Sequence, residues 1–196
     1  MKVSLVRIPT IIDVSASTAP VCPPIGLAYL KAIVKLFTND IQVIDSVGNF
    51  PKTRTVLSGE ISVTLLGQTK EEIANLLSEN IDIILVSCMF SQDWDYAKQV
   101  LREIRLKCPE SLIVAGGEHI TALPEYSMET APEIDVCVLG EGERTLHNIF
   151  QNLQSNGSID QNLPGTFLRG KDGKTIQNKM NQMKLDTVFK MLKLMQ

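Results

Sequence analysis

The stretch SLIVAGGEHITALPEYSMETAPEIDVCVLGEGE (residues 111–143) contains two short apolar runs, and glycines and glutamates follow each of them. The runs, 111–116 and 134–140, are apolar at nearly every position, which is typical of strands buried on both faces of a parallel sheet. The carboxyl ends of parallel strands lie at one edge of a sheet, so we expect both glycine-rich turns at that edge, where ligands bind.

Three further runs of this kind precede them, at residues 2–8, 41–45 and 81–87. Amphipathic segments with helical spacing separate the runs, most clearly around Leu27, Ile73, Trp94 and Leu146. Five strands that alternate with helices through right-handed crossovers predict a Rossmann-like or flavodoxin-like α/β fold. We therefore expect a doubly wound, five-stranded parallel sheet in the order 2-1-3-4-5.

Four segments depart from a minimal fold of this kind. Residues 8–23 and 46–68 are predicted as long loops, and long loops in compact domains are often functional. Residues 123–132 are too short and interrupted for more than two helical turns. Residues 163–178 predict a β-hairpin around Lys-Asp-Gly-Lys, with a Met- and Lys-rich tail after it. These patterns divide the chain into a ligand-binding domain, 1–155, and a hairpin with its tail, 156–196.

Composition excludes several classes of partner. The chain has 196 residues and a formal net charge of -3, which argues against binding to nucleic acid or to anionic membranes. No apolar run is long enough to span a bilayer, and the start lacks the features of a signal peptide, so we expect a cytoplasmic protein. The cysteines form no C-x-x-C or C-x-x-x-C-x-x-C motif, so we expect reduced thiols and no iron–sulfur cluster or protein-held metal. They are Cys22, Cys88, Cys108 and Cys137.

The glycine turns have two interpretations. Gly116 and Gly117 permit positive φ and close approach of a ligand to the backbone, although any strand-to-loop corner can contain glycine. The segment 140–143, Gly-Glu-Gly-Glu, offers the same freedom, and its glutamates also suit the first turn of a helix. No G-x-G-x-x-G or Walker A sequence follows the first strand, which disfavours a site built around a dinucleotide phosphate.

The chain has only two histidines, and neither predicts catalysis. His147 is expected on the exposed face of a helix. His119 follows the double glycine, so it is expected to face the binding site, where a contact with the ligand, an ordering role in the loop and a purely structural role all remain open. No Ser-His-Asp or Cys-His arrangement is indicated by the spacing.

Taken in order, four motifs resemble the cobalamin-binding domain at the amino terminus of B12-dependent radical S-adenosylmethionine enzymes. The resemblance covers roughly residues 1–175, and each motif alone would be weak. The motifs are PPIGLAYL (23–30), SCMFSQDWDYAKQVLREIR (from Ser87), GGEH (116–119) and IDVCVLGEGERTL (from Ile134).

This resemblance implies how a corrinoid would be held. The nucleotide tail of cobalamin would enter a slot made by Gly116 and Gly117, with Ser87 near the base at its end. The corrin ring would lie across the strand ends, reached on one side by the long first loop as far as Pro24. The remaining residues expected to contact the cofactor are Met89, Phe90, Ser91, Glu118, His119, Gly140, Glu141, Gly142 and Glu143.

The chain departs from related families at two points. Many cobalamin domains carry a D-x-H-x-x-G loop whose histidine binds cobalt, and residues 8–24 contain no histidine. We therefore expect no protein histidine from that loop on the metal. The barrel of the radical enzymes, with its cluster-binding cysteines, is also missing from the sequence. The chain alone is thus expected to be a binding module without catalysis, with a radical barrel as a partner in cis or in trans.

Two alternatives of other classes stay open. The domain could have lost its cofactor and act as a protein-interaction module, although the intact glycine turns disfavour this. It could also be a small flavodoxin-like protein that binds a nucleotide or flavin, which the missing phosphate loop disfavours. A Gly117→Val or Gly117→Leu substitution is expected to block the tail slot and leave the fold largely intact.

Overall fold

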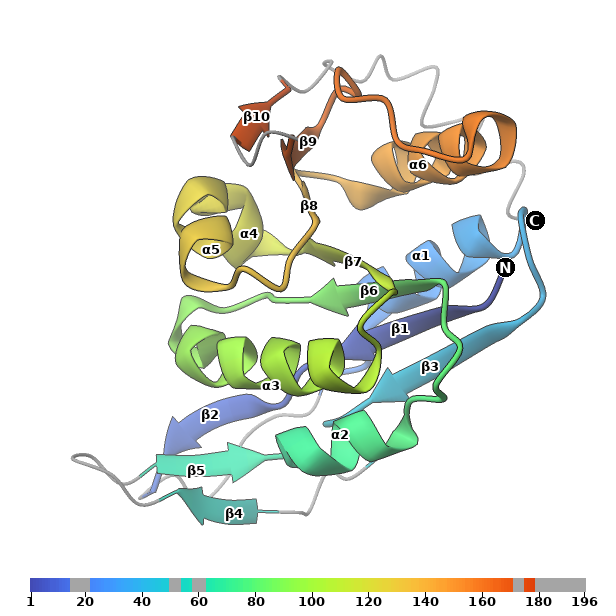
Figure 1. Ribbon diagram of the computed structural model, residues 1–196. Coiled ribbons are helices and arrows are strands. Elements are labelled where there is room, and N and C mark those ends of the chain that lie inside the picture. Colours follow the sequence, from blue (N-terminus) through green and yellow to red (C-terminus); the bar gives the residue numbers. More distant parts are fainter. Residues whose placement is uncertain (15–21, 50–53, 58–62, 171–174, 179–196) are drawn as a thin grey trace.

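A computed structural model describes residues 1–14, 22–49, 54–57, 63–170 and 175–178. Its main sheet contains five parallel strands in the order β3-β1-β6-β7-β8, which is the predicted order 2-1-3-4-5 (Figure 1). The doubly wound α/β fold is therefore confirmed. The strands are β1 (Val3–Arg7), β3 (Ile41–Asp45), β6 (Ile83–Ser87), β7 (Leu112–Gly116) and β8 (Val136–Val138).

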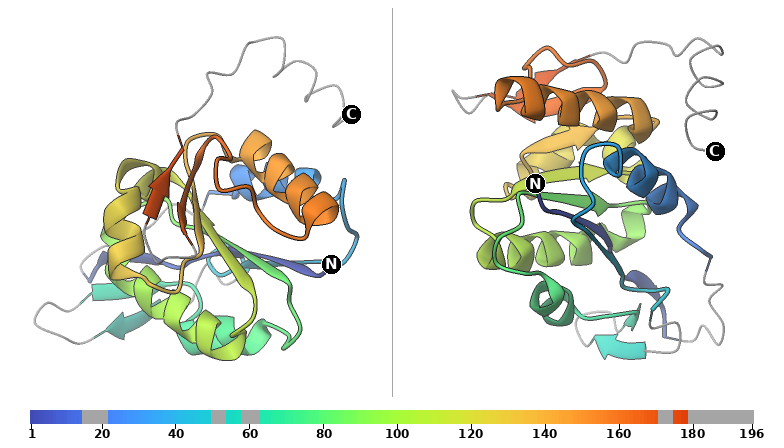
Figure 2. Two further views of the ribbon diagram at one scale, coloured as in Figure 1. Left: turned by 45° about the horizontal axis from the view of Figure 1, so that its top comes forward. Right: turned by 90° about the vertical axis from the view of Figure 1, so that its right-hand side faces the viewer.

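Side chains of the central strands alternate between two buried cores, as strands covered on both faces require. In β1, Val3 and Leu5 enter one core, whereas Val6 enters the other. The first core lies under α1 (Ile25–Val34) and α6 (Gly142–Asn156). The second lies under α2 (Lys70–Leu76), α3 (Trp94–Lys107), α4 (Glu118–Ala122) and α5 (Pro124–Thr130). The left view of Figure 2 shows α1 and α6 on one side of the sheet and α2 and α3 on the other.

Helix boundaries follow local sequence signals. Thr69 caps α2 with its side chain, and Glu72 returns a bond to the backbone of Thr69, which forms a capping box. Gly157, in the left-handed conformation, ends α6. The short 3-10 turn η1 (Ser91–Asp93) leads directly into α3, whose apolar face is buried as its spacing predicts.

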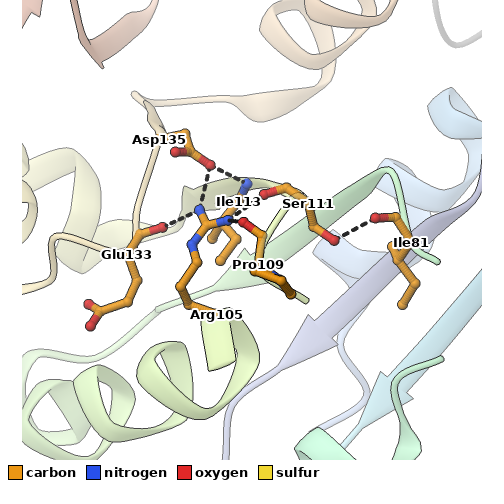
Figure 3. Close-up of polar contacts among 7 residues, drawn as sticks. All are labelled: Ile81, Arg105, Pro109, Ser111, Ile113, Glu133 and Asp135. Carbon is orange, nitrogen blue, oxygen red and sulfur yellow. Dashed lines mark hydrogen bonds and ion pairs between the residues drawn. The ribbon is translucent and has the colours of Figure 1, made fainter. Parts of the chain in front are cut away.

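Arg105 ties together three segments at the amino-terminal end of the sheet (Figure 3). Its guanidinium donates to the carbonyl oxygens of Pro109, Ser111 and Glu133 at 2.7–2.9 Å, and to a carboxylate oxygen of Asp135 at 2.7 Å. The same oxygen of Asp135 accepts a bond from the backbone N–H of Ile113 at 2.7 Å. This network joins the end of α3 to the starts of β7 and β8.

The two predicted loops are not loops throughout, which corrects the prediction for 8–23 and 46–68. They form a separate antiparallel sheet in the order β2-β5-β4, from β2 (Thr10–Asp13), β4 (Arg54–Leu57) and β5 (Val63–Leu66). Figure 1 places it at the carboxyl-terminal end of the main strands. The sequence gives little sign of these strands because each has only four residues and pairs with a segment distant in sequence. Residues 15–21, 50–53 and 58–62 lie outside the described residues.

The predicted hairpin is confirmed as β9 (Thr166–Arg169) and β10 (Thr175–Gln177), which pair antiparallel. It also extends the main sheet, because β9 pairs antiparallel with β8. The turn at 171–174 and the tail at 179–196 lie outside the described residues. Within the described ranges, no helix combines the length and apolar character needed to cross a bilayer.

Candidate functional site

A cleft of about 210 Å³ opens at the carboxyl-terminal end of the main sheet, on the face covered by α1 and α6. Strands β6, β7 and β8 form its floor, and the first turns of α1 and α6 form its walls. An engineered apolar cavity of about 150 Å³ holds benzene, so this cleft has room for a bicyclic aromatic group but not for a macrocycle. The residues lining it are Leu5, Gly26, Leu27, Leu30, Leu85, Val86, Ser87, Met89, Val114, Ala115, Gly116, Gly117, Glu118, Val138, Gly140, Glu141, Gly142, Glu143 and Leu146.

Ser87 and Gly116 lie side by side at the ends of β6 and β7. They share the face of Leu85 and Val114, two residues earlier in each strand, so Ser87 and the bare Cα of Gly116 face the cleft. A Cβ at Gly116 would come no closer than 3.8 Å, to Val138. The missing side chain therefore leaves open space. Among the described residues, the hydroxyl of Ser87 has no hydrogen-bond partner, so it is available to a ligand.

Gly117 has a different role from Gly116. Its φ of 111° lies in a region that only glycine adopts readily. A Cβ there would lie 2.4 Å from the carbonyl oxygen of Cys88, too close for any contact. The expectation that Gly117→Val would leave the fold intact is therefore wrong. Gly117 allows the chain to turn from β7 into α4, and Gly116 is the residue that leaves the slot open.

The second glycine turn forms the opposite wall. Gly140 has a φ of 67°, and its N–H donates to Thr121 Oγ1 at 3.0 Å. Gly142 begins α6, and a Cβ on it would lie 3.3 Å from Leu30 of α1. The glycine thus lets α1 and α6 approach each other closely beside the cleft. Gly26, in the first turn of α1, also lines the cleft. Among the described residues, no heavy atom lies within 4 Å of a Cβ built on it.

Glutamates surround the mouth of the cleft. Glu118 and Glu141 are exposed, and Glu143 is partly exposed. The described lining residues include neither Lys nor Arg. The mouth is therefore electronegative, which suits a cation or hydrogen-bond donors.

His119 lies away from the cleft, contrary to the expectation from its position after the double glycine. Its side chain is 3% exposed and stacks on Trp94 with ring centroids 4.3 Å apart. Its Nδ1 lies 2.8 Å from the hydroxyl of Ser91. Burial lowers the pKa of His119, and its Nε2 has no partner among the described residues. The histidine thus orders the start of α4 against α3, and it has almost no surface to offer a ligand.

Asp93 is a buried acid that was not predicted from the sequence. It is 2% exposed and accepts a bond from the N–H of Ile11 at 2.7 Å, while Gln92 donates to the carbonyl oxygen of Ile11 at 3.0 Å. This pair of contacts anchors β2 of the small sheet to η1. Burial raises the pKa of Asp93 to about 6, and the bond from Ile11 opposes that shift.

The structure brings nine of the expected site residues to the cleft and leaves four outside it. Pro24 precedes α1, Phe90 and Ser91 lie on the surface after β6, and His119 is buried. Met89 and Phe90 are 44% and 55% exposed, an apolar surface beside the cleft mouth. The nine that line the cleft are Ser87, Met89, Gly116, Gly117, Glu118, Gly140, Glu141, Gly142 and Glu143.

The apolar part of the lining was not predicted from the sequence. Leu85 and Val114 could have been predicted from the alternation of side chains along a strand. They lie two positions before Ser87 and Gly116 and therefore face the same side of the sheet. Gly26 stood within the quoted motif PPIGLAYL. Leu5 and Leu146 carry no local signal, because their contact with the cleft depends on how β1 and α6 pack.

A doubly wound sheet with a mostly apolar cleft at the strand ends defines a domain that binds a small molecule. The model of the B12 binding domain family matches residues 11–150. The chain therefore belongs to this family, as its sequence motifs predict.

Two curated relatives are methyltransferases. Cytidylyl-2-hydroxyethylphosphonate methyltransferase of Streptomyces wedmorensis is 26% identical over 152 residues, which are 77% of this chain and 28% of that protein. An uncharacterized methyltransferase of Pyrococcus horikoshii is 29% identical over 160 residues, 81% of this chain and 31% of that protein. The chain thus spans less than a third of the length of these relatives.

A solved structure shares the fold. The cobalamin-dependent S-adenosylmethionine radical enzyme OxsB, with aqua-cobalamin and S-adenosylmethionine bound, superposes with a TM-score of 0.65 at 18% identity. The match covers 98% of this chain and 25% of that enzyme. At this identity the likeness concerns the fold alone.

Proposed function

We propose that the chain is a cobalamin-binding module that holds the nucleotide tail of the cofactor in the cleft between α1 and α6. The observation that carries the proposal is the space left by Gly116 beside the hydroxyl of Ser87, which has no hydrogen-bond partner among the described residues, on the floor of a cleft sized for a bicyclic base. Membership of the B12 binding domain family supports the choice of cofactor.

The residues at the mouth suit the rest of the cofactor. Amide donors surround the corrin ring, and Glu118, Glu141 and Glu143 present carboxylates that could accept hydrogen bonds from them. The exposed side chains of Met89 and Phe90 offer an apolar surface to the ring. The same carboxylates would repel the doubly charged terminal phosphate of a flavin or nucleotide more strongly than the singly charged phosphodiester of the cobalamin tail, and the described lining residues include no basic side chain.

When bound, cobalamin would supply a cobalt centre that carries an alkyl group for transfer. This chain would contribute binding and orientation, and catalysis would need a radical barrel in cis or in trans. The sequence offers no histidine at residues 8–24 and no cluster-binding cysteine motif. We therefore propose that the lower face of the cobalt receives no histidine from this loop, and that any iron–sulfur cluster belongs to the partner.

Titration of the purified chain with hydroxocobalamin tests the proposal. Calorimetry is expected to saturate at about one equivalent, and the visible spectrum is expected to shift towards the base-off form because the cleft takes the base away from cobalt. A folded chain, verified by circular dichroism, that binds no cobalamin would contradict the proposal and favour the interaction-module alternative.

A Ser87→Ala variant locates the tail within the cleft. Loss of one neutral hydrogen bond is expected to weaken hydroxocobalamin binding about threefold to tenfold. Cobinamide, which has the corrin ring but no nucleotide base, is the control ligand, and its affinity is expected to be unchanged. Equal losses for both ligands would place Ser87 at the ring instead.

A further inference from the structure

The walls of the cleft are apolar at depth and polar only at the mouth. Leu5, Leu85, Val114, Val138 and Leu146 are each at most 5% exposed and line the same cavity. Ser87 provides the hydroxyl in this apolar part, whereas the three glutamates lie towards solvent. A group that enters the cleft can therefore form one hydrogen bond with a side chain there.

Three backbone groups around the floor are already paired, so these three add little. The carbonyl oxygen of Gly116 accepts from Cys88 N–H at 2.8 Å, and that of Gly117 accepts from Thr121 N–H at 2.9 Å. The N–H of Gly140 donates to Thr121 Oγ1 at 3.0 Å. A buried polar group of the ligand that finds no partner here would lose its hydrogen bonds to water without replacement.

Natural corrinoids differ in the base at the end of the tail, and two common bases differ in polarity more than in size. Dimethylbenzimidazole, once released from cobalt, has one free ring nitrogen, which accepts one hydrogen bond, and two methyl groups. Adenine has further ring nitrogens and an exocyclic amine. Since a cleft of about 210 Å³ admits either bicycle, its polarity and not its volume distinguishes them.

We infer that this cleft selects corrinoids by their lower base, and that it prefers dimethylbenzimidazole to adenine. The inference rests on the proposed function and specifies the ligand class of the same site. The hydroxyl of Ser87 would satisfy the one nitrogen of dimethylbenzimidazole, and the methyl groups of this base would meet the apolar lining formed by Val138 and the leucines. Adenine leaves several polar atoms without partners, so the adenine-containing corrinoid is expected to bind at least about tenfold more weakly.

The test compares three ligands on the full chain by calorimetry, namely hydroxocobalamin, its adenine-containing analogue and cobinamide. The inference predicts that hydroxocobalamin binds at least about tenfold more tightly than the adenine analogue. Equal affinity for these two ligands would overturn the inference and leave the proposed function intact. No binding of any of the three by the folded chain would overturn the proposed function itself.

A matched pair of variants tests the physical cause. Val138→Thr places a hydroxyl in the cleft with little change of shape, whereas Val136→Thr places one on the same face of β8, outside the cleft lining. Both valines are buried, at 5% and 4% exposure, so the two variants carry similar structural costs. Val138→Thr is expected to reduce the preference for dimethylbenzimidazole at least about threefold, and Val136→Thr to leave it unchanged. An unchanged preference in both variants would overturn the polarity argument.

Discussion

The two ends of the main sheet are built on opposite principles. At the amino-terminal end, the guanidinium of Arg105 on α3 binds four oxygens of two segments, the one before β7 and the one before β8. At the carboxyl-terminal end, a side chain is missing at Gly116, and an apolar cleft stays open. One end contributes stability and the other contributes space. Substitutions at the two ends should therefore separate stability from binding.

Even within the open end, adjacent glycines serve different purposes. Gly117 has positive φ and no room for a Cβ, so Gly117→Val is expected to lower the free energy of unfolding by about 3 to 5 kcal/mol. Urea denaturation measures this loss. Gly116→Ala is the control, because its Cβ meets only ordinary contacts, and it is expected to change stability by less than about 1 kcal/mol. Equal stability of the two variants would contradict the distinction between the glycines.

At the closed end, Arg105→Met should destabilise the chain without weakening ligand binding. The substitution keeps much of the apolar stem but removes the bonds to Pro109, Ser111, Glu133 and Asp135. The side chain is one-quarter exposed, so water replaces part of the loss, and we expect about 2 to 3 kcal/mol in urea denaturation. Arg105→Lys should recover only a part of this lost stability, because an ammonium group lacks the planar array of N–H donors of the guanidinium. A lower cobalamin affinity in an Arg105→Met chain that is still folded would show that the two ends are coupled.

Asp93, at the open end, is expected to make the stability of the fold depend on pH. Its pKa is raised to about 6 in the fold, so the folded chain favours the neutral carboxyl more strongly than the unfolded chain does. The stability it contributes is fully present below about pH 4 and is lost as the pH rises through about 6. Asp93→Asn stays neutral and still offers an oxygen to Ile11 N–H. It is expected to remove this decline and to gain on the order of 1 to 2 kcal/mol at pH 7.

Urea denaturation at pH 4 to 7 measures the decline in both proteins. Asp95→Asn, in the first turn of α3 and exposed, controls for the loss of a carboxylate. Parallel stability profiles for wild type and Asp93→Asn would refute the assignment of the pH dependence to Asp93.

The sequence predicted the main sheet because its strands, such as β6, are continuous apolar runs that need no distant partner to be recognised. It did not predict β2, β4 and β5, whose pairing joins segments far apart in the chain. The glycine turns of the site were found, but their roles were not, because the φ of Gly117 and the distance to Cys88 depend on the folded backbone. His119 was placed wrongly since the turn of α4 directs it towards Trp94, on the opposite face of the sheet from the cleft.

Hydroxocobalamin affinity of Gly116→Leu, measured beside Gly116→Ala and wild type, tests the central claim most directly. The claim is that the tail occupies the space in front of Gly116. A leucine side chain would extend into the cleft from its floor, so the account predicts affinity at least about tenfold lower in Gly116→Leu, near wild type in Gly116→Ala, and folded chains in both. Unchanged affinity in a folded Gly116→Leu chain would contradict the claim and place the tail elsewhere.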